Sequence, residues 1–298
     1  MKYLSQTKLS ALYPQINAIK SKAPFYTNLF TYTNIPYRVK STPSTLLLLK
    51  EEKHCVRAYF FSNDLAELES LITALEHDKN LCIEILQKQP ESPKISFETL
   101  QPQALYTHLR KTLPLPTPKP SNPMRPCRFP TIHPKTLQKI LFHDFKPDFD
   151  HLPSLKTLQH HHKNGHILSI REQNIIHSYV VFRPAGKSAY LNFIANHGDK
   201  QSLLEIWRLF YQKLNALEVR FLHLWCDTLN QKALNMYQKE NFSPDGLKNY
   251  IYIKLANTNG GGGIARIFID FLIAFVIFFS FNPRILKPLS QPARKMSR

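Results

Sequence analysis

The sequence predicts an α/β fold in which helices pack against a mixed (α+β) sheet. Along both halves of the chain, apolar strand-like runs alternate with amphipathic helical segments, an order typical of layered architectures. In the second half, the strand-like run 219–226 leads into a short capped helix, and another such run, 250–255, follows it. The length of 298 residues and the hydrophobic content of 43% suit two folded domains with ordinary cores.

A proline-rich segment marks the clearest domain boundary. Residues 113–130 contain seven prolines, which lack a backbone donor and favour an extended spacer. We therefore predict a smaller N-terminal α/β accessory domain at 1–112, a linker at 113–130 and a second folded domain at 131–256. Residues 257–298 form a tail of different composition, which contains four consecutive glycines.

In the first region, the pattern predicts a hairpin, a helix and a further strand. The apolar runs 45–50 and 55–61 flank a charged turn, as in an antiparallel hairpin. Residues 64–75 have the spacing of an amphipathic helix, with Asn63 or Asp64 as its cap. The run 81–86 is predicted to be the following strand.

In the second region, two helical segments precede three strands and a long helix. Turn residues separate the strands, so we predict an antiparallel meander. The long helix carries its large apolar side chains on one face. The predicted helices cover residues 134–142, 152–162 and 201–215, and the predicted strands cover 166–171, 175–182 and 189–195.

The short helix that follows 219–226 has recognisable signals at both ends. Asn230 is a typical N-cap, because its side chain can accept a hydrogen bond from the first turn. Ala233 and Tyr237 are four residues apart and share one face. Asn241 stands where helices usually end on a left-handed glycine, and Phe242 returns the chain to the core.

This helix resembles the late half of the GNAT superfamily of N-acetyltransferases, whose pattern runs N-x-x-A-x-x-x-Y-x-x-x-G-F. Asn230, Ala233, Tyr237 and Phe242 match the pattern, and Asn241 replaces its glycine. The resemblance covers residues 131–254 and implies a GNAT-like acyltransferase domain. It implies that Tyr237 protonates the departing thiolate of acetyl-CoA, the expected cofactor. The alternative is that Tyr237 is only a core aromatic. The first region is then an accessory domain or a degenerate GNAT-like copy.

The resemblance also implies which residues bind acetyl-CoA. The main chain of 193–195 is expected to hold the pantetheine arm, and the start of the long helix is expected to hold the pyrophosphate. The family's phosphate loop has a second glycine, whereas this chain offers one glycine followed by Asp199. The expected cofactor-binding residues are Phe193, Ile194, Ala195, Gly198, Lys200, Gln201, Ser202, Asn230 and Ala233.

Two functions follow as alternatives. The first is an N-acetyltransferase in which an amine of a small molecule or peptide attacks acetyl-CoA directly. The second is a catalytically degenerate GNAT-fold module that binds a partner or serves as a scaffold. The general base is not identified, and Glu172 and His177, in or beside the meander, are its candidates.

Composition excludes or disfavours several other classes. The formal charge of +18 does not favour nucleic acid, because 113–130 and 257–298 supply eight of these charges and no basic run is interleaved with aromatics. The four cysteines form no paired motif, so neither a disulfide framework nor a metal site is predicted, and a reducing, cytoplasmic setting is expected. The histidines at 160–162 and 166 are interpreted as a solvated loop. The few glycines leave no room for a Walker or dinucleotide loop.

The tail contains the hydrophobic run 264–281, which is followed by a basic end. Its eighteen residues barely reach the length that a bilayer requires, and Asp270 would be costly inside the membrane. One interpretation is a C-terminal membrane anchor, and the other is a hydrophobic extension irrelevant to the fold.

Overall fold

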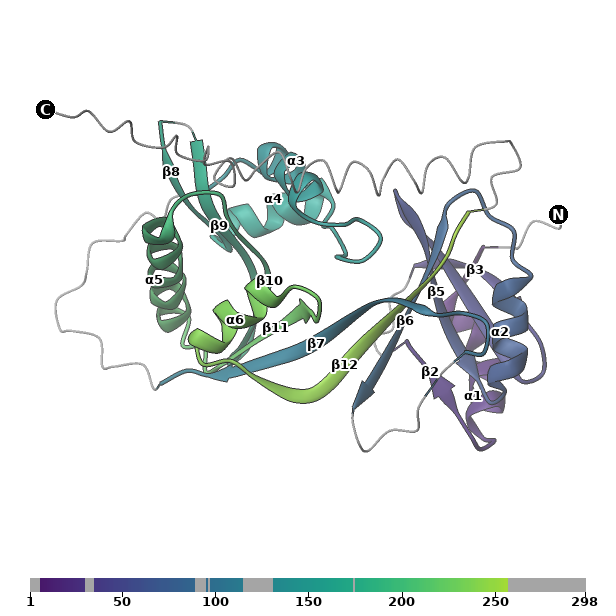
Figure 1. Ribbon diagram of the computed structural model, residues 1–298. Coiled ribbons are helices and arrows are strands. Elements are labelled where there is room, and N and C mark those ends of the chain that lie inside the picture. Colours follow the sequence, from purple (N-terminus) through teal and green to yellow (C-terminus); the bar gives the residue numbers. More distant parts are fainter. Residues whose placement is uncertain are drawn as a thin grey trace, which may run out of the picture. The chain divides into compact units, whose positions relative to one another are not determined.

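A mixed sheet of 12 strands runs through the described part of the chain. The computed structural model describes residues 6–29, 35–88, 95, 97–114, 131–173 and 175–256. The strands are β1 (Gln6–Lys8), β2 (Tyr26–Thr27), β3 (Pro36–Ser41), β4 (Thr45–Glu51), β5 (Cys55–Ser62), β6 (Asn80–Lys88), β7 (Pro102–Thr112), β8 (Ile167–Glu172), β9 (Ile175–Ala185), β10 (Ser188–Asn196), β11 (Phe221–Asp227) and β12 (Ser243–Lys254). Their spatial order is β1-β3-β4-β5-β6-β12-β7-β11-β10-β9-β8, with β2 beside β5 (Figure 1).

Six α-helices and one 3₁₀ helix accompany these strands in the described residues. They are η1 (Leu9–Leu12), α1 (Tyr13–Lys20), α2 (Leu65–Thr73), α3 (Pro134–Asp144), α4 (Leu155–Lys163), α5 (Lys200–Ala216) and α6 (Gln231–Lys239). The predicted α/β class with a mixed sheet is confirmed, and so is the element order expected from the GNAT resemblance at 131–254. One interpretation is wrong: the histidines at 160–162 lie on α4 rather than in a loop, and His161 is buried because α4 turns that face toward the sheet.

The N-terminal half of the sheet has an apolar layer on each face. The strands β3, β4 and β5 are antiparallel, and α2 then crosses over to place β6 parallel to β5. On one face, α2 packs through Leu68 and Ile72 against β4, β5 and β6. On the other, η1 and α1 pack through residues such as Ile16 against Leu46 and Leu48. The continuous leucine run of β4 is therefore explained by burial on both faces.

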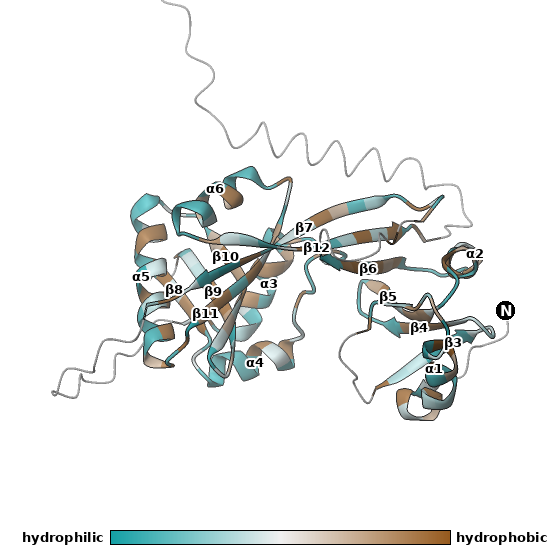
Figure 2. Ribbon diagram, turned by 90° about the horizontal axis from the view of Figure 1, so that it is seen from below, coloured by the Kyte–Doolittle hydropathy of each residue, from teal (hydrophilic) through white to brown (hydrophobic). Residues whose placement is uncertain are grey.

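The C-terminal half repeats this plan. The strands β8, β9 and β10 form the predicted antiparallel meander, and α5 crosses over to place β11 parallel to β10. The helices α5 and α6 pack on one face around Trp207 and Phe210. The helices α3 and α4 pack on the other face around Leu137 and Leu158. Figure 2 shows apolar residues concentrated on the strands and on the inner sides of these helices.

The two halves exchange their closing strands. The strand β7 follows β6 along the chain, yet it pairs antiparallel with β11 over residues 106–112 and 221–227. The strand β12 follows α6, yet its residues 247–254 pair with 81–88 of β6. The strands β7 and β12 also pair with each other at the centre of the sheet. Each half therefore takes its last strand from the end of the other.

The strand β7 was missing from the sequence prediction, and its burial pattern has no regular alternation that would have indicated a strand. Because β7 and β12 join the halves, one sheet spans both predicted domains. The division of the chain into two domains by a linker at 113–130 remains a prediction. The hydrophobic run 264–281 lies outside the described residues. Within the described ranges, every helix is too short or too polar to cross a membrane.

Replacement of Ile251 by alanine tests the strand exchange. This buried side chain lies on β12, opposite Glu84 of β6 and Ala104 of β7. We expect Ile251→Ala to lower the free energy of unfolding by about 2–5 kcal/mol. Because β12 belongs to both halves, tryptophan fluorescence and amide exchange in β4–β6 should shift together. Leu255→Ala, at an exposed position just beyond β12, is the control, and unchanged exchange in β4–β6 would contradict the shared core.

His166 should make stability depend on pH. Burial, together with the neighbouring His161 and Lys213, lowers the pKa of His166 from 6.5 to about 4. Between these values the unfolded chain binds a proton that the folded chain does not, so the unfolding free energy should fall as pH drops from 6.5 to about 4. Denaturant titrations at several pH values give the unfolding free energy as a function of pH. In His166→Gln, this free energy should change less between pH 6.5 and about 4 than it does in the wild type. If the exposed control His133→Gln reduced the pH dependence of the unfolding free energy equally, His166 would not be its source.

Candidate functional site

A gap opens between two parallel strands of the C-terminal half. The strands β10 and β11 pair only over Ser188–Tyr190 and Phe221–His223, and then diverge. A β-bulge between Leu191 and Phe193 bends β10 at this point. Beyond the bulge, β10 remains paired with β9 on one side, while its other side has no strand partner among the described residues. Backbone donors and acceptors on that side are available to a ligand.

The equivalent gap in the N-terminal half is closed. The strands β5 and β6 pair over four positions and diverge after Ala58 and Ile83. There β2 adds to β5, and the Asn28 amide bridges the two strands. Asn28 Nδ2 donates to the carbonyls of Ala58 (2.9 Å) and Glu84 (3.0 Å), and its Oδ1 accepts from the Phe60 N–H (2.8 Å). Among the described residues, no strand is added beside β10 beyond the bulge, and no side-chain amide links the diverging backbones of β10 and β11 in this way.

The helix α6 is fixed at both ends, as the sequence predicts. The Asn230 side chain accepts from the Ala233 N–H at 3.0 Å, which confirms the N-cap. Asn241 has φ of 62°, which confirms the left-handed exit. The Phe242 N–H donates to the Tyr237 carbonyl at 3.0 Å, and the Asn241 N–H to the Gln238 carbonyl at 2.9 Å. These two bonds form a Schellman motif that holds the backbone of Tyr237 in place.

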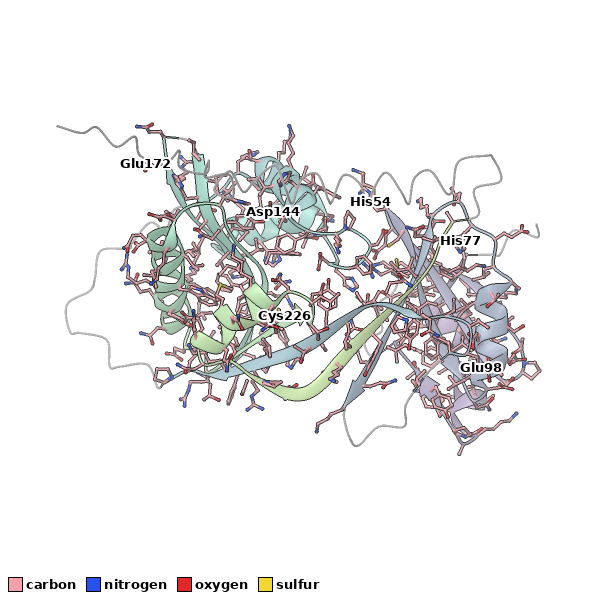
Figure 3. The ribbon with its side chains drawn as sticks, in the orientation of Figure 1. His54, His77, Glu98, Asp144, Glu172 and Cys226 are labelled. Atoms are coloured by element: carbon pink, nitrogen blue, oxygen red, sulfur yellow. The ribbon has the colours of Figure 1, made fainter. Side chains whose placement is uncertain are left out.

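Tyr237 lies in the core cluster that α5 and α6 form with β10 and β11. Its ring makes edge contacts with Trp207 (6.4 Å between centroids) and Phe242 (5.6 Å). Burial, with a smaller effect from Cys226 on β11 (labelled in Figure 3), raises the pKa of Tyr237 above its usual value. The hydroxyl has no hydrogen-bond partner among the described residues, yet it is not one of their fully buried unpaired polar atoms. The phenol is therefore held in its protonated form.

The predicted cofactor-binding residues on β10 alternate between the two faces. Phe193 packs toward α3 and α4, where its ring meets Phe145 at 4.9 Å. Ile194 points to the opposite face and joins the cluster that contains Tyr237 and Ala233. Ala195 packs again on the α3–α4 side. The structure thus places the Ile194 side chain on the face of the sheet where Ala233 and Tyr237 pack, and the side chains of Phe193 and Ala195 on the opposite face.

The loop between β10 and α5 is tied down by its own polar groups. The N–H groups of His197 and Gly198 both donate to the His177 carbonyl, at 2.7 and 3.0 Å. The Asp199 carboxylate caps α5 by accepting from the Ser202 N–H and Oγ, each at 2.8 Å. A Cβ at Gly198 would lie 2.8 Å from Ser202 Oγ and 2.9 Å from His177 Cβ, so only glycine fits there. Gly198 and Ser202 are consequently occupied with internal contacts.

Two of the predicted phosphate-binding residues remain open. Lys200 and Gln201 begin α5 and are exposed. Their N–H groups belong to the first turn, which has no acceptor within the helix, and none occurs elsewhere in the described residues. The start of α5 therefore combines two available donors and the Lys200 ammonium with the negative charge of Asp199.

Sequence reasoning missed a polar cluster beside this loop. Asp144, at the end of α3, accepts from the Tyr179 hydroxyl at 2.7 Å, and its Oδ2 lies 2.9 Å from His197 Nε2. The residues lie 53 and 35 positions apart in sequence, so no local pattern could have indicated them. For the two predicted base candidates, Nε2 of His177 lies 4.0 Å from Oε2 of Glu172. The Glu172 side chain, labelled in Figure 3, is mostly exposed.

Comparison with known proteins gives structural similarity without sequence similarity. No protein-family model matches the chain, and no curated protein matches its sequence. Its structure is similar to a GCN5-related N-acetyltransferase from Sphaerobacter thermophilus (10% identity, TM-score 0.44, 74% of this chain and 78% of that one). It is also similar to a GCN5-related N-acetyltransferase from Kribbella flavida (12% identity, TM-score 0.44, 87% of this chain and 98% of that one). A third similar structure is a tandem GNAT protein from the clavulanic acid biosynthesis pathway (12% identity, TM-score 0.42, 77% of this chain and 82% of that one).

The left-handed exit of α6 can be tested at Asn241. Because its φ is 62°, Asn241→Ala should lower the unfolding free energy by about 1–2 kcal/mol. Asn241→Gly should leave it nearly unchanged, since glycine adopts this conformation without strain. Denaturant melts of both variants check the prediction. Equal destabilisation by both would show that the asparagine side chain, rather than its backbone conformation, matters.

Proposed function

We propose that this chain is an N-acetyltransferase that transfers an acetyl group from acetyl-CoA to an amine. The observation that supports this most is the divergence of β10 from β11, with the buried, protonated Tyr237 in the same core cluster as Ile194 of β10. The closed gap between β5 and β6 is an internal comparison, because the same topology there is filled by β2 and Asn28. The proposed site therefore belongs to the C-terminal half.

Acetyl-CoA is proposed to lie along the open side of β10. The backbone of Phe193, Ile194 and Ala195 would hold the pantetheine arm, and the N-terminus of α5 at Lys200 and Gln201 would hold the pyrophosphate. Asn230 and Ala233 are proposed to contribute as the cap and first turn of α6, which set the position of the next turn.

In the proposed reaction, the amine nitrogen attacks the thioester carbonyl carbon, and the carbon–sulfur bond then breaks. The departing thiolate takes the phenolic proton of Tyr237, whose raised pKa keeps that proton available at neutral pH. The proton lost by the amine passes to a base, for which Glu172 and His177 remain candidates.

The second candidate function is a GNAT-fold binding module without catalysis. The phosphate loop supports it, since two of its N–H groups donate to His177 and the Asp199 carboxylate occupies the helix start. A carboxylate there repels a pyrophosphate and weakens the favourable field of the helix. Cofactor binding therefore depends on whether the donors of Lys200 and Gln201 outweigh Asp199.

Calorimetric titration of acetyl-CoA and CoA into the full chain separates the two functions. Saturable binding at one site supports the acetyltransferase, and a folded protein that binds neither supports the binding module. In the first case, Tyr237→Phe should lower kcat by about 10²-fold or more while the Kd for CoA stays nearly unchanged. Tyr252→Phe, at a buried tyrosine of the N-terminal half, is the control. Full activity of Tyr237→Phe would remove this residue from the mechanism.

Asp199→Asn tests the electrostatic argument. Asparagine caps helices as well as aspartate, so α5 should be preserved while one negative charge is removed. Removal of this negative charge takes away a repulsion with the pyrophosphate, so CoA should bind several-fold more tightly. Glu205→Gln, which removes the same charge further along α5, should have a smaller effect. Unchanged affinity in Asp199→Asn would show that the pyrophosphate does not bind at this helix start.

A further inference from the structure

Two cysteines and an aspartate meet in the N-terminal half of the sheet. Cys55 begins β5 and Cys82 lies on the parallel strand β6, whose register pairs Cys55 with Asn80 and Arg57 with Cys82. Residues two apart on a strand share a face, so both thiols point to the same side. The segment between α3 and α4 brings Asp148 to this side. One ligand atom from each of the three residues lies within 4.8 Å of the other two.

We propose that Cys55, Cys82 and Asp148 bind a divalent transition metal, with Zn²⁺ as the best fit. Two thiolates and a carboxylate are a soft donor set that suits zinc better than magnesium or calcium. Both cysteines are 1% exposed, so the site is already assembled and dry on the sheet side. Binding displaces the two thiol protons, because only the thiolate coordinates the metal.

The surroundings of the three ligands suit a bound ion. Asn80 Nδ2 donates to Asp148 Oδ2 at 2.9 Å, which fixes the carboxylate as outer partners do in metal sites. A divalent ion with these three anionic ligands leaves one net negative charge. The buried Arg57 is the register partner of Cys82 and lies two residues after Cys55, so it places a positive charge on the same face, where it also pairs with Glu52 and Glu84.

Arg57 also provides an independent observation. Its Nε donates to Glu52 at 2.8 Å and its Nη1 to Glu84 at 2.6 Å, but its buried Nη2 has no acceptor among the described residues. An unpaired donor on a charged group this deeply buried is costly. A thiolate fixed by a metal is an acceptor that a neutral thiol supplies poorly, and it would satisfy this donor.

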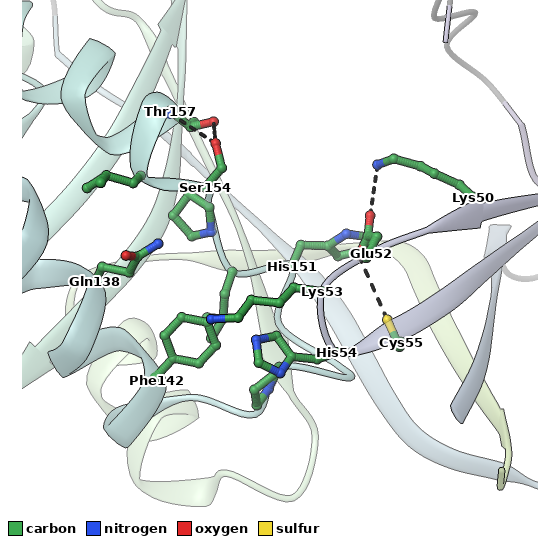
Figure 4. A pocket seen from close by; sticks show the side chains of 14 residues that line it. Lys50, Glu52, Lys53, His54, Cys55, Gln138, Phe142, His151, Ser154 and Thr157 are labelled. Atoms are coloured by element: carbon green, nitrogen blue, oxygen red, sulfur yellow. Dashed lines mark hydrogen bonds and ion pairs between the residues drawn. The ribbon is translucent and has the colours of Figure 1, made fainter. Parts of the chain in front are cut away.

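A pocket gives access to the site. Its volume is about 540 Å³, and Cys55, Glu52 and His151 are among its lining residues (Figure 4). Figure 4 shows the Cys55 sulfur directed toward Glu52 at the pocket wall. Three protein ligands leave the fourth tetrahedral position of zinc open to water or to a group entering from this pocket. The sequence did not predict this site, because Cys55 and Cys82 are far apart in the chain and form no paired motif.

Cobalt titration tests the proposal without any assay of acetyl transfer, so its failure is separate from failure of the proposed function. Metal-free full-length protein is kept reduced with a non-thiol reductant and titrated with Co²⁺. We expect one Co²⁺ per chain, a thiolate-to-cobalt charge-transfer band and the visible bands of tetrahedral cobalt, all removed by added Zn²⁺. Cys55→Ser and Cys82→Ser should abolish the charge-transfer band.

Two further sets of variants control for misfolding and for Co²⁺ binding by other cysteines. Asp148→Asn preserves shape at a partly exposed position and should weaken Co²⁺ binding about tenfold or more while tryptophan fluorescence stays native. Cys226→Ser and Cys127→Ser, the latter outside the described residues, should leave the spectrum unchanged. A spectrum that persists in the Cys55 and Cys82 variants overturns the proposal. So does wild-type protein that binds no Co²⁺ although mass analysis shows that Cys55 and Cys82 are both reduced.

Discussion

The antiparallel pairing of β7 with β12 is the constraint on which the rest of the structure depends. Each strand closes the sheet of the other half, so β11 has no antiparallel neighbour without β7, and β6 has none without β12. Both pairings join residues more than 100 positions apart. Such contacts repay their loop-closure cost only when the two halves are both in place. Strand exchange therefore makes one folding unit of two regions that composition separates.

The same constraint sets up two parallel junctions with different uses. In each half, a helix crosses over to place a parallel strand that pairs briefly and then diverges. Divergence leaves backbone groups unpaired, and a buried backbone group needs a partner. In the N-terminal half the Asn28 amide and β2 supply that partner, whereas in the C-terminal half the described residues do not. A few polar contacts thus distinguish a structural junction from a ligand-binding one.

The two halves of the sheet also differ in the charges that they bury. The C-terminal junction keeps a neutral phenol in an apolar core and places a carboxylate at the helix start, where a phosphate-binding site is normally positive. The N-terminal half instead buries a charged network around Arg57, Glu52 and Glu84, next to two thiols and a carboxylate that fit a metal ion. The half with the closed gap is therefore the half that holds the proposed metal ligands.

The sequence alone determined the elements whose signals are local. Hydrophobic periodicity located the strands and helices of the second half, and the Asn230 cap with the Asn241 exit located α6 and Tyr237, because caps and turns are set by neighbouring residues. Tertiary structure alone decided the rest. The register that places β12 between β6 and β7, the filling of one gap by Asn28, the tether of His197 by Asp144 and the meeting of Cys55, Cys82 and Asp148 join distant residues. Such contacts depend on which strands become neighbours, and no local pattern in the sequence specifies that choice.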